Sequence, residues 1–249
     1  MKPFTRLLNR MILISSLLLP NLLQAAELDW QIYDQLLKQH ITSGTKDGIK
    51  LNLVDYSAIA KDPKYQQALD QLQQYPLENL KTPAEKQAFY INAYNLLTLK
   101  MMVSNWPVDS IRDIGNFFSP VWKKTIGTLG GKSVTLDQIE HKILRPMGDP
   151  RVHMAIVCAS ISCPDLRPEA YTAIKLENQL DDQTKSFVAN NLKGVKVNGL
   201  KVTPSKIFDW FEEDFKKTGV LQFIKQYRPL EKESRLVSNL KYNWKHNGN

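Results

Sequence analysis

The segment from Thr82 to Val103 constrains the fold of this 249-residue chain more than any other. Thr82 can cap a helix, Pro83 suits the first helical position, and Glu85 lies at capping-box distance from Thr82. The residues that follow, 84–103, carry apolar side chains on almost every helical face. A helix that is apolar all round is buried, so we expect this one at the centre of the core.

Two asparagines, Asn92 and Asn95, interrupt the apolar surface of this helix. A buried amide without a hydrogen-bond partner costs about 1–3 kcal/mol, so both side chains need partners. In one interpretation they bind loop backbone inside the core. In the other they orient a catalytic side chain.

Helices and hairpins alternate along the rest of the chain without a regular βαβ order. Apolar periodicity and capping residues predict helices at 29–41, 62–72, 136–146, 168–190, 203–215 and 220–227. Gly130-Gly131 and Asn198-Gly199 mark hairpin turns, and 49–56 and 239–244 can form short strands. We therefore expect the α+β class: a single domain at 27–249, with one small, mainly antiparallel sheet packed by several helices around the central helix.

Residues 1–26 are typical of a secretory signal peptide. Three basic residues precede an apolar stretch at 11–19, which Pro20 ends, and small residues follow at 25–26. We expect cleavage near residue 26 and a periplasmic or secreted protein. The alternative is an uncleaved membrane anchor, which is disfavoured because the apolar stretch is too short to span a bilayer.

The net charge limits the classes of partner. The chain carries +8 at pH 7, and cleavage at residue 26 would remove three basic residues to leave +5. The lysines are scattered and no arginine-rich stripe is present, so a nucleic-acid partner is not expected. We expect an unknown protein or an envelope polymer as the partner, and no stable membrane insertion after signal cleavage.

The only two cysteines, Cys158 and Cys163, lie close to His153 in one segment. The apolar run Val152–Cys158 predicts a buried strand, and Cys163 falls in the loop after it. In a strand, His153 and Cys158 point to opposite faces, whereas the loop can return Cys163 to the His153 face. Pro164 suits the start of a helical turn, whose N–H groups would lower the pKa of the Cys163 thiol.

Several motifs, taken in chain order, resemble the bacterial domain-of-unknown-function family 547. They are VDY at 54–56, FYINAYN at 89–95, IEH at 139–141 with LR at 144–145, DPRVH at 149–153 followed by CAS at 158–160 and SCP at 162–164, FDW at 208–210 with DF at 214–215, and YNW at 242–244. The resemblance extends over essentially all of 27–249. It implies an uncharacterised exported protein and no particular activity.

One functional hypothesis is a thiol-dependent hydrolase or acyl transferase. Cys163 would be the nucleophile and His153 the base, with Asn92, Asn95 or Glu140 orienting the imidazole. A long helix, a histidine and a thiol resemble the components of papain-like and transglutaminase-like enzymes. The chain order differs, because in those enzymes the cysteine comes first, on the central helix.

The competing hypothesis, which the sequence slightly favours, is a non-catalytic envelope or secreted binding module. In that case a disulfide between Cys158 and Cys163 would pin the loop, as an oxidising compartment permits. A metal site built from the two cysteines, His141 and His153 matches no standard zinc spacing. We therefore expect no metal and no cofactor.

Three further expectations concern neighbouring side chains. Glu140 is expected to be buried against Arg145 or Arg151, and His141 to be on the surface. The aromatic residues Phe208, Trp210, Phe211 and Phe215 are expected to pack as core rather than to bind a ligand.

Overall fold

The central helix begins where its capping residues predict. In the computed structural model, which describes residues 28–116 and 120–249, helix α4 runs from Pro83 to Val103. Thr82 Oγ1 accepts a hydrogen bond from the Glu85 amide, and the Glu85 carboxylate accepts one from the Thr82 amide. Side chains on all faces of α4 are buried, so the helix is the axis of the core. The predicted signal peptide lies outside the described residues.

The other helices and strands are mostly short. The helices are α1 Gln31–His40, α2 Tyr56–Ile59, α3 Pro63–Gln74, α5 Leu136–Gln138, α6 Val152–Ala155, α7 Leu176–Ala189, α8 Ile207–Trp210, α9 Glu212–Phe215 and α10 Val220–Tyr227. A π-helix, η4, spans Ile139–Leu144, and 3₁₀ turns lie at Leu77–Asn79 (η1), Ile111–Ile114 (η2), Val121–Lys123 (η3) and Arg145–Met147 (η5). No helix in the described part of the chain is both long and apolar enough to cross a bilayer.

The α+β class is confirmed, but the strands form three small sheets in place of the single sheet expected. The antiparallel hairpins are β1 Ile41–Lys46 with β2 Ile49–Val54, β3 Thr125–Leu129 with β4 Lys132–Thr135, and β5 Val195–Asn198 with β6 Lys201–Pro204. A two-residue strand, β7 Arg235–Leu236, pairs parallel to β6. Each hairpin packs on neighbouring helices, so no continuous sheet is needed to cover the core.

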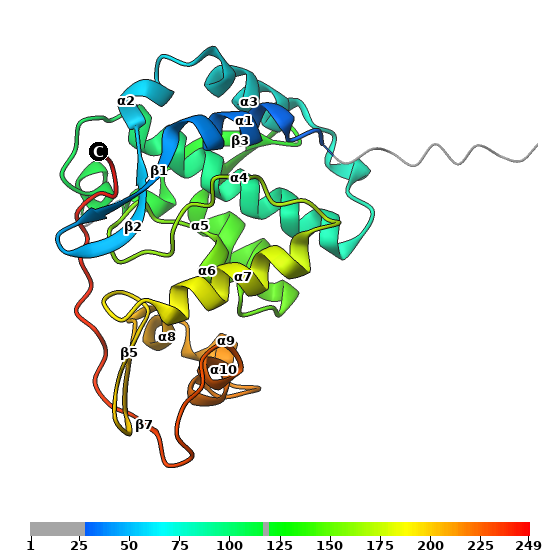
Figure 1. Cartoon of the computed structure of the whole chain (residues 1–249). Coiled ribbons are helices and arrows are strands. Elements are labelled where there is room, and N and C mark those ends of the chain that lie inside the picture. The colour runs from blue at the N-terminus through cyan, green and yellow to red at the C-terminus, as the bar shows by residue number, and fades with distance from the viewer. Residues whose placement is uncertain (1–27, 117–119) are drawn as a thin grey trace, which may run out of the picture.

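The buried apolar residues form two clusters that meet near α6. The larger one surrounds α4 and includes side chains of α1, α3 and η4. The smaller one joins Met154 to side chains of α7, α8, α9, α10 and the β5–β6 hairpin. In Figure 1, α7 (yellow) runs between the main body and the lobe that holds β5, α8, α9, α10 and β7. The C-terminal tail (red) then returns from this lobe to the β1–β2 hairpin.

The strand predicted at Val152–Cys158 is wrong: Val152–Ala155 is one helical turn, α6, and only the residues after it are extended. The Ile156 amide donates to the Val152 carbonyl at 3.0 Å, which closes the turn. Met154 packs in the smaller cluster, whereas Val152 and Ala155 pack in the larger. Because the segment is buried on all sides, its apolar run does not distinguish a strand from a helix.

Two predicted helix boundaries also change. The helix expected at 168–190 begins only at Leu176, because the backbone of Ala170 and Tyr171 is not helical and bonds side chains of α4 and α7 instead. The helix expected at 203–215 is split into α8 and α9 at Phe211. The split turns the Phe211 side chain toward His153, where the two rings stack.

Asn92 and Asn95 bind loop backbone inside the core. Asn92 donates to the Tyr171 carbonyl at 2.7 Å and accepts from the Tyr171 amide at 2.9 Å. Asn95 donates to the Ala155 carbonyl at 3.0 Å and accepts from the Val157 amide at 2.9 Å. The backbone groups of Tyr171, Ala155 and Val157 are thus hydrogen-bonded to side chains of α4 in place of backbone partners. The bonds of Asn95 also fix the backbone that leads into the cysteine loop.

Replacing Asn92 with leucine is therefore expected to destabilise the protein although it adds apolar volume. The substitution leaves the buried amide and carbonyl of Tyr171 without partners, at a cost of about 1–3 kcal/mol each. Urea denaturation of the variant and the wild type measures the effect. The matched control is Asn105→Leu, at a more exposed asparagine that bonds only within its own turn. An Asn92→Leu midpoint at or above that of the wild type would contradict the expectation.

Candidate active site

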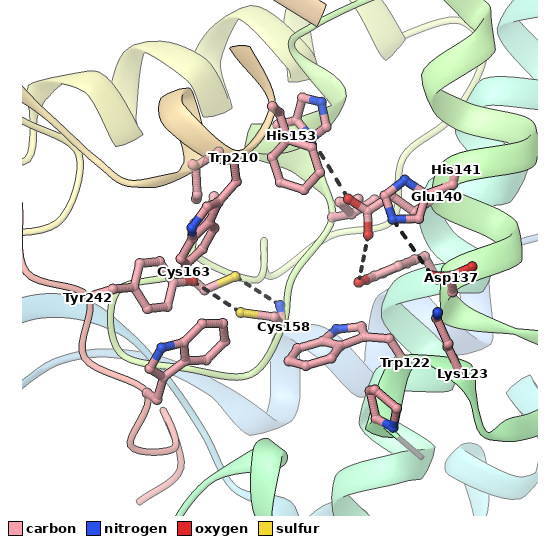
Figure 2. Close-up of a pocket in the computed structure, with 17 residues that line it drawn as sticks. Trp122, Lys123, Asp137, Glu140, His141, His153, Cys158, Cys163, Trp210 and Tyr242 are labelled. Carbon is pink, nitrogen blue, oxygen red and sulfur yellow. Dashed lines mark hydrogen bonds and ion pairs between the residues drawn. The ribbon is translucent and has the colours of Figure 1, made fainter. Parts of the chain in front are cut away.

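A pocket of about 340 Å³ lies between the two apolar clusters. Its walls are largely aromatic, and the aromatic side chains are Tyr94, Trp122, Trp210, Phe211, Tyr242 and Trp244. The groups capable of acid–base or nucleophilic chemistry are Lys123, Asp137, Glu140, His141, His153, Cys158 and Cys163. Figure 2 shows both thiols on one side of this space and Glu140, His141 and His153 on another. The size and lining are those of a small-molecule site.

A tight loop brings the two cysteines together. Ala159 adopts φ 58°, a left-handed conformation that costs a non-glycine residue about 1–2 kcal/mol. The Cys163 amide then donates to the Ser160 carbonyl at 3.1 Å. The Cys158 amide donates to Cys163 Sγ at 2.8 Å. Both thiols are free, and their sulfurs lie 3.0 Å apart without a bond between them.

Two hydroxyl groups converge on Cys158. Its Sγ lies 3.1 Å from Ser160 Oγ and 3.2 Å from Tyr242 Oη. The hydrogen bond from the Cys163 thiol is the largest cause that lowers the pKa of Cys158 to about 6, and Ser160 and Tyr242 lower it further. Burial and the neighbouring Cys158 raise the pKa of Cys163 well above its usual value. These contacts favour the thiolate on Cys158 over one on Cys163.

The chain after the cysteines is anchored by Asp165. The Asp165 carboxylate accepts from Lys193 Nζ at 2.6 Å and from the Asn52 amide at 2.9 Å. The Asp165 carbonyl accepts from Gln183 Nε2 at 2.6 Å. Lys193 is buried and Asp165 is partly exposed, and together these bonds hold the loop against β2 and α7.

His153 is held by a carboxylate and an aromatic ring. Its Nε2 lies 2.7 Å from Asp214 Oδ2, and its ring stacks on Phe211 with 4.0 Å between centroids. Because a carboxylate only accepts, Nε2 carries the proton and Nδ1 presents a lone pair. Nδ1 is buried without a hydrogen-bond partner. Burial lowers the pKa of His153 to about 4 against the opposing effect of Asp214, so the ring is neutral at pH 7.

Asp214 is shared between His153 and Arg145. The Arg145 guanidinium binds it with two hydrogen bonds, of 2.6 and 3.0 Å. Burial opposes the charge of Asp214, but these bonds and the one from His153 hold its pKa below the usual range. The pair ties η5 to α9 and so fixes the imidazole from outside the pocket.

Glu140 faces His153 from the π-helix η4. Its Oε1 lies 4.0 Å from His153 Nδ1, and its Oε2 accepts from the Tyr94 hydroxyl at 3.4 Å. Glu140 is buried as predicted and lies within the field of Arg145, whose charge opposes the rise of its pKa. Its direct ion pairs with arginine are missing among the described residues, because Arg145 binds Asp214 and Arg151 binds acidic residues on α7 and in its own turn. Burial raises the pKa of Glu140 to about 7, and the nearby Cys158 adds to the rise. Glu140 can therefore hold or release a proton near neutral pH.

Cys163, His153 and Glu140 line one pocket, but the structure gives no hydrogen bond from Cys163 to His153, the residue proposed as its base. The prediction that His153 and Cys158 point to opposite faces of a strand is wrong, because Val152–Ala155 is helical. Asn92 and Asn95 bond backbone and not the imidazole. His141 is on the surface as predicted, with its Nδ1 against Arg145.

The aromatic residues of 208–215 divide between two roles. Phe208 and Phe215 pack in the smaller core cluster as predicted. Trp210 and Phe211 instead line the pocket, and Trp210 is 43% exposed. Trp210 stacks on Trp244, with 5.5 Å between ring centroids. These two tryptophans therefore form part of the pocket wall.

Sequence reasoning missed the role of Cys158 and the contribution of the C-terminal tail. Tyr242 and Trp244 were recognised only as part of a motif, and Asp214 likewise. A single tyrosine or tryptophan in this part of the sequence does not indicate which distant residues its side chain will contact. Across residues 28–116 and 120–249, no group of three or more His, Cys, Asp or Glu side chains is arranged to hold a metal ion.

Comparison with known families supports the resemblance drawn from the motifs. Residues 77–188 match the family model described as "Protein of unknown function, DUF547". This part of the chain includes α4, η4, α6 and the cysteine loop, and hence the core of the site. The matched region ends before the FDW and YNW motifs. No curated protein and no solved structure matches the chain.

Proposed function

We propose that this protein is an exported thiol-dependent enzyme of the acyl-transfer class, a hydrolase or transferase, with Cys158 as the nucleophile. One observation carries the proposal. The Cys158 sulfur, held by hydroxyl groups of Ser160 and Tyr242, opens on a pocket of about 340 Å³ that also contains Glu140. A low-pKa thiol and a carboxyl group with a pKa near neutrality are the two components that nucleophilic acyl transfer needs.

The reaction would run in two steps through an acyl-enzyme. The Cys158 thiolate attacks the carbonyl carbon of an ester, amide or thioester and forms the S–C bond. The leaving group departs as its bond to that carbon breaks, with the proton of the Glu140 carboxyl. Water or an acceptor then gives a proton to the Glu140 carboxylate, attacks the acyl group and releases Cys158.

His153 would act through Glu140 in this scheme. Its unpaired Nδ1 lies 4.0 Å from the Glu140 carboxyl and can accept a hydrogen bond from it after a small movement. Asp214 keeps the proton on Nε2 and so keeps Nδ1 available. His153 is thus a positioning residue for the carboxyl proton.

A second candidate function is the non-catalytic binding module with a bridged cysteine loop. It is favoured by the 3.0 Å separation of the two sulfurs, which an oxidant in an oxidising compartment could join after a small movement, by removing two hydrogens from the thiols. A bridge would remove the thiolate that the first proposal needs. Thiol counting on protein purified without reductant separates the two. Export, which both proposals include, is tested by N-terminal sequencing for a start near residue 26.

Alkylation of the reduced protein is expected to label Cys158 with a pH midpoint near 6, and Cys163 only slowly. At pH 7 a thiol with a pKa of 6 has a thiolate fraction about 90-fold that of a thiol with a pKa of 9. However, a thiolate of lower pKa is intrinsically a weaker nucleophile. The net rate gain is roughly three- to sixfold, so the midpoint is the diagnostic quantity. Iodoacetamide labelling between pH 5 and 9, followed by peptide mass spectrometry, measures it.

Tyr242→Phe should move this midpoint upward, because it removes a hydroxyl 3.2 Å from the Cys158 sulfur. The matched control is Tyr227→Phe, which removes a hydroxyl that bonds Asp181 instead. If Cys158 in the wild type labels only above pH 8, the thiol is not activated and the acyl-transfer proposal fails.

A further inference from the structure

The two thiols have different accessibility, and Cys163 has no part in the proposed acyl transfer. Cys158 is half-buried and opens on the pocket, whereas Cys163 is 4% exposed. Both cysteines line the pocket, but Cys163 is the less exposed, and the turn through Ala159 and Ser160 holds it against Cys158. A ligand in the pocket therefore reaches Cys158 first.

The loop geometry allows the two sulfurs to bond. They lie 3.0 Å apart, and a disulfide requires about 2.05 Å, so an approach of about 1 Å suffices. The backbone is already folded back at Ala159, so the approach requires no unfolding of the loop. The Cys158 amide points at Cys163 Sγ and would stabilise negative charge that develops there.

The two cysteines differ in reactivity and exposure, as thiol–disulfide exchange requires. The exchange requires a reactive thiolate that attacks a disulfide and a second thiol that displaces the product from it. Cys158 meets the first requirement and Cys163, adjacent and protected from bulk reagents, meets the second. The aromatic walls of the pocket suit a disulfide with apolar flanking groups, as in a peptide.

We propose that the Cys158–Cys163 pair carries out thiol–disulfide exchange with small or peptide disulfides that enter the aromatic pocket. The Cys158 thiolate attacks one sulfur of the substrate, forms a mixed disulfide and releases the other half as a thiolate. Cys163 then attacks the Cys158 sulfur, forms the internal disulfide and releases the second half, which takes the Cys163 proton. Two electrons pass from the cysteine pair to the substrate disulfide.

This activity rests on the nucleophilic Cys158 of the proposed function and adds a role for Cys163. Closing the internal bridge removes the thiolate and so stops acyl transfer, and a reducing thiol reverses it. The bridged and reduced forms correspond to the two candidate functions given above. In this inference they are two states of one protein.

The test is to mix reduced protein with glutathione disulfide, quench with acid and read intact and peptide masses. Wild type, Cys158→Ser and Cys163→Ser are compared, after circular dichroism and thermal melts show that all three are folded. A second arm replaces glutathione disulfide with a peptide disulfide that has tryptophan beside each cysteine. Faster reaction of the peptide would assign the pocket to peptide disulfides, and equal or slower reaction to small ones.

Wild type is expected to lose two hydrogens, release two glutathione molecules and accumulate no adduct. Cys163→Ser is expected to hold a stable glutathione adduct on Cys158, and Cys158→Ser to react at least tenfold more slowly. A persistent adduct in the wild type would overturn the role of Cys163 and leave the proposed function standing. If neither the wild type nor Cys163→Ser reacts with the disulfides, Cys158 is not a nucleophile and both proposals fail.

Discussion

Replacing Glu140 with glutamine is expected to stabilise the protein by on the order of 3 kcal/mol at pH 8 and to leave it nearly unchanged at pH 4.5. Burial raises the pKa of Glu140 from 4.5 to about 7 in the folded protein. Between these values the folded state holds the proton and the unfolded state releases it. Stability therefore falls as the pH rises through this window, and each pKa unit corresponds to about 1.4 kcal/mol.

In the wild type, the ionisation of His153 opposes the fall of stability with pH that Glu140 causes. Burial lowers its pKa from 6.5 to about 4, so the folded state binds fewer protons than the unfolded state between these values. Stability linked to His153 therefore rises with pH from 4 to 6.5, while the Glu140 contribution falls. In Glu140→Gln the falling contribution is removed and the rising one from His153 remains, so stability should rise more steeply with pH than in the wild type.

Urea denaturation at several pH values from 4.5 to 8 measures the difference between the two proteins. The control is Glu231→Gln, the same chemical change at an exposed carboxylate. An equal difference for Glu140→Gln at pH 4.5 and pH 8 would show that Glu140 ionises normally and would remove the proton donor from the proposed mechanism.

The features predicted correctly from sequence depend on residues close together in the chain. The Thr82–Glu85 capping box, the turn at Gly130-Gly131 and helix α10 each form where the sequence indicates, whereas the turn predicted at Asn198-Gly199 lies one residue later, at Gly199-Leu200. Each is determined by side chain to backbone contacts, or by periodicity, within a few positions. Local chemistry decides these elements before tertiary contacts form.

The features that sequence could not give depend on two core clusters meeting at α6. Val152 and Met154 are both apolar because each packs in a core cluster, and the two clusters are different. The apolar residues therefore show no helical periodicity in the sequence. The π-helix at Ile139–Leu144, which turns Glu140 toward His153, likewise leaves no distinctive pattern. The sequence therefore indicated the segment that supplies His153, Cys158 and Cys163 to the pocket, but not the direction of their side chains.

The choice between the two thiols is the clearest case of this limit. Cys163 was expected to be the activated thiol because Pro164 follows it. In the structure, Cys158 is activated by the neighbouring Cys163 and by Tyr242, which lies 84 positions away along the chain. No pattern within the cysteine segment can report a hydroxyl group supplied by the C-terminal tail.

Removal of residues 242–249 is expected to have the largest effect on stability of the changes considered. This tail is bonded to the cysteine loop and to the end of β2, in place of the single edge strand expected from its sequence. It accepts hydrogen bonds from the amides of Val54, Ile161 and Ser162. It also accepts one from the Tyr56 hydroxyl, which is buried and lies 2.6 Å from Asn247 Oδ1.

Each of these four donors loses its partner in the truncated protein, at about 1–3 kcal/mol for a group that stays buried. A loss of at least about 4 kcal/mol is expected, which for a chain of this size lowers Tm by roughly 8–16 °C. Thermal melts followed by circular dichroism measure it. Lys241→Ala, at an exposed residue next to the deleted segment, is the control and should leave Tm unchanged.

The truncation also separates a structural role of the tail from a functional one. It removes the Tyr242 hydroxyl from Cys158, so the alkylation midpoint of any folded fraction should rise toward that of an ordinary thiol. Tyr242→Phe should raise the midpoint while costing little stability, because the ring contacts with Trp210 and Trp244 remain. A truncated protein with the wild-type Tm and the wild-type midpoint would show that the tail is not part of the site.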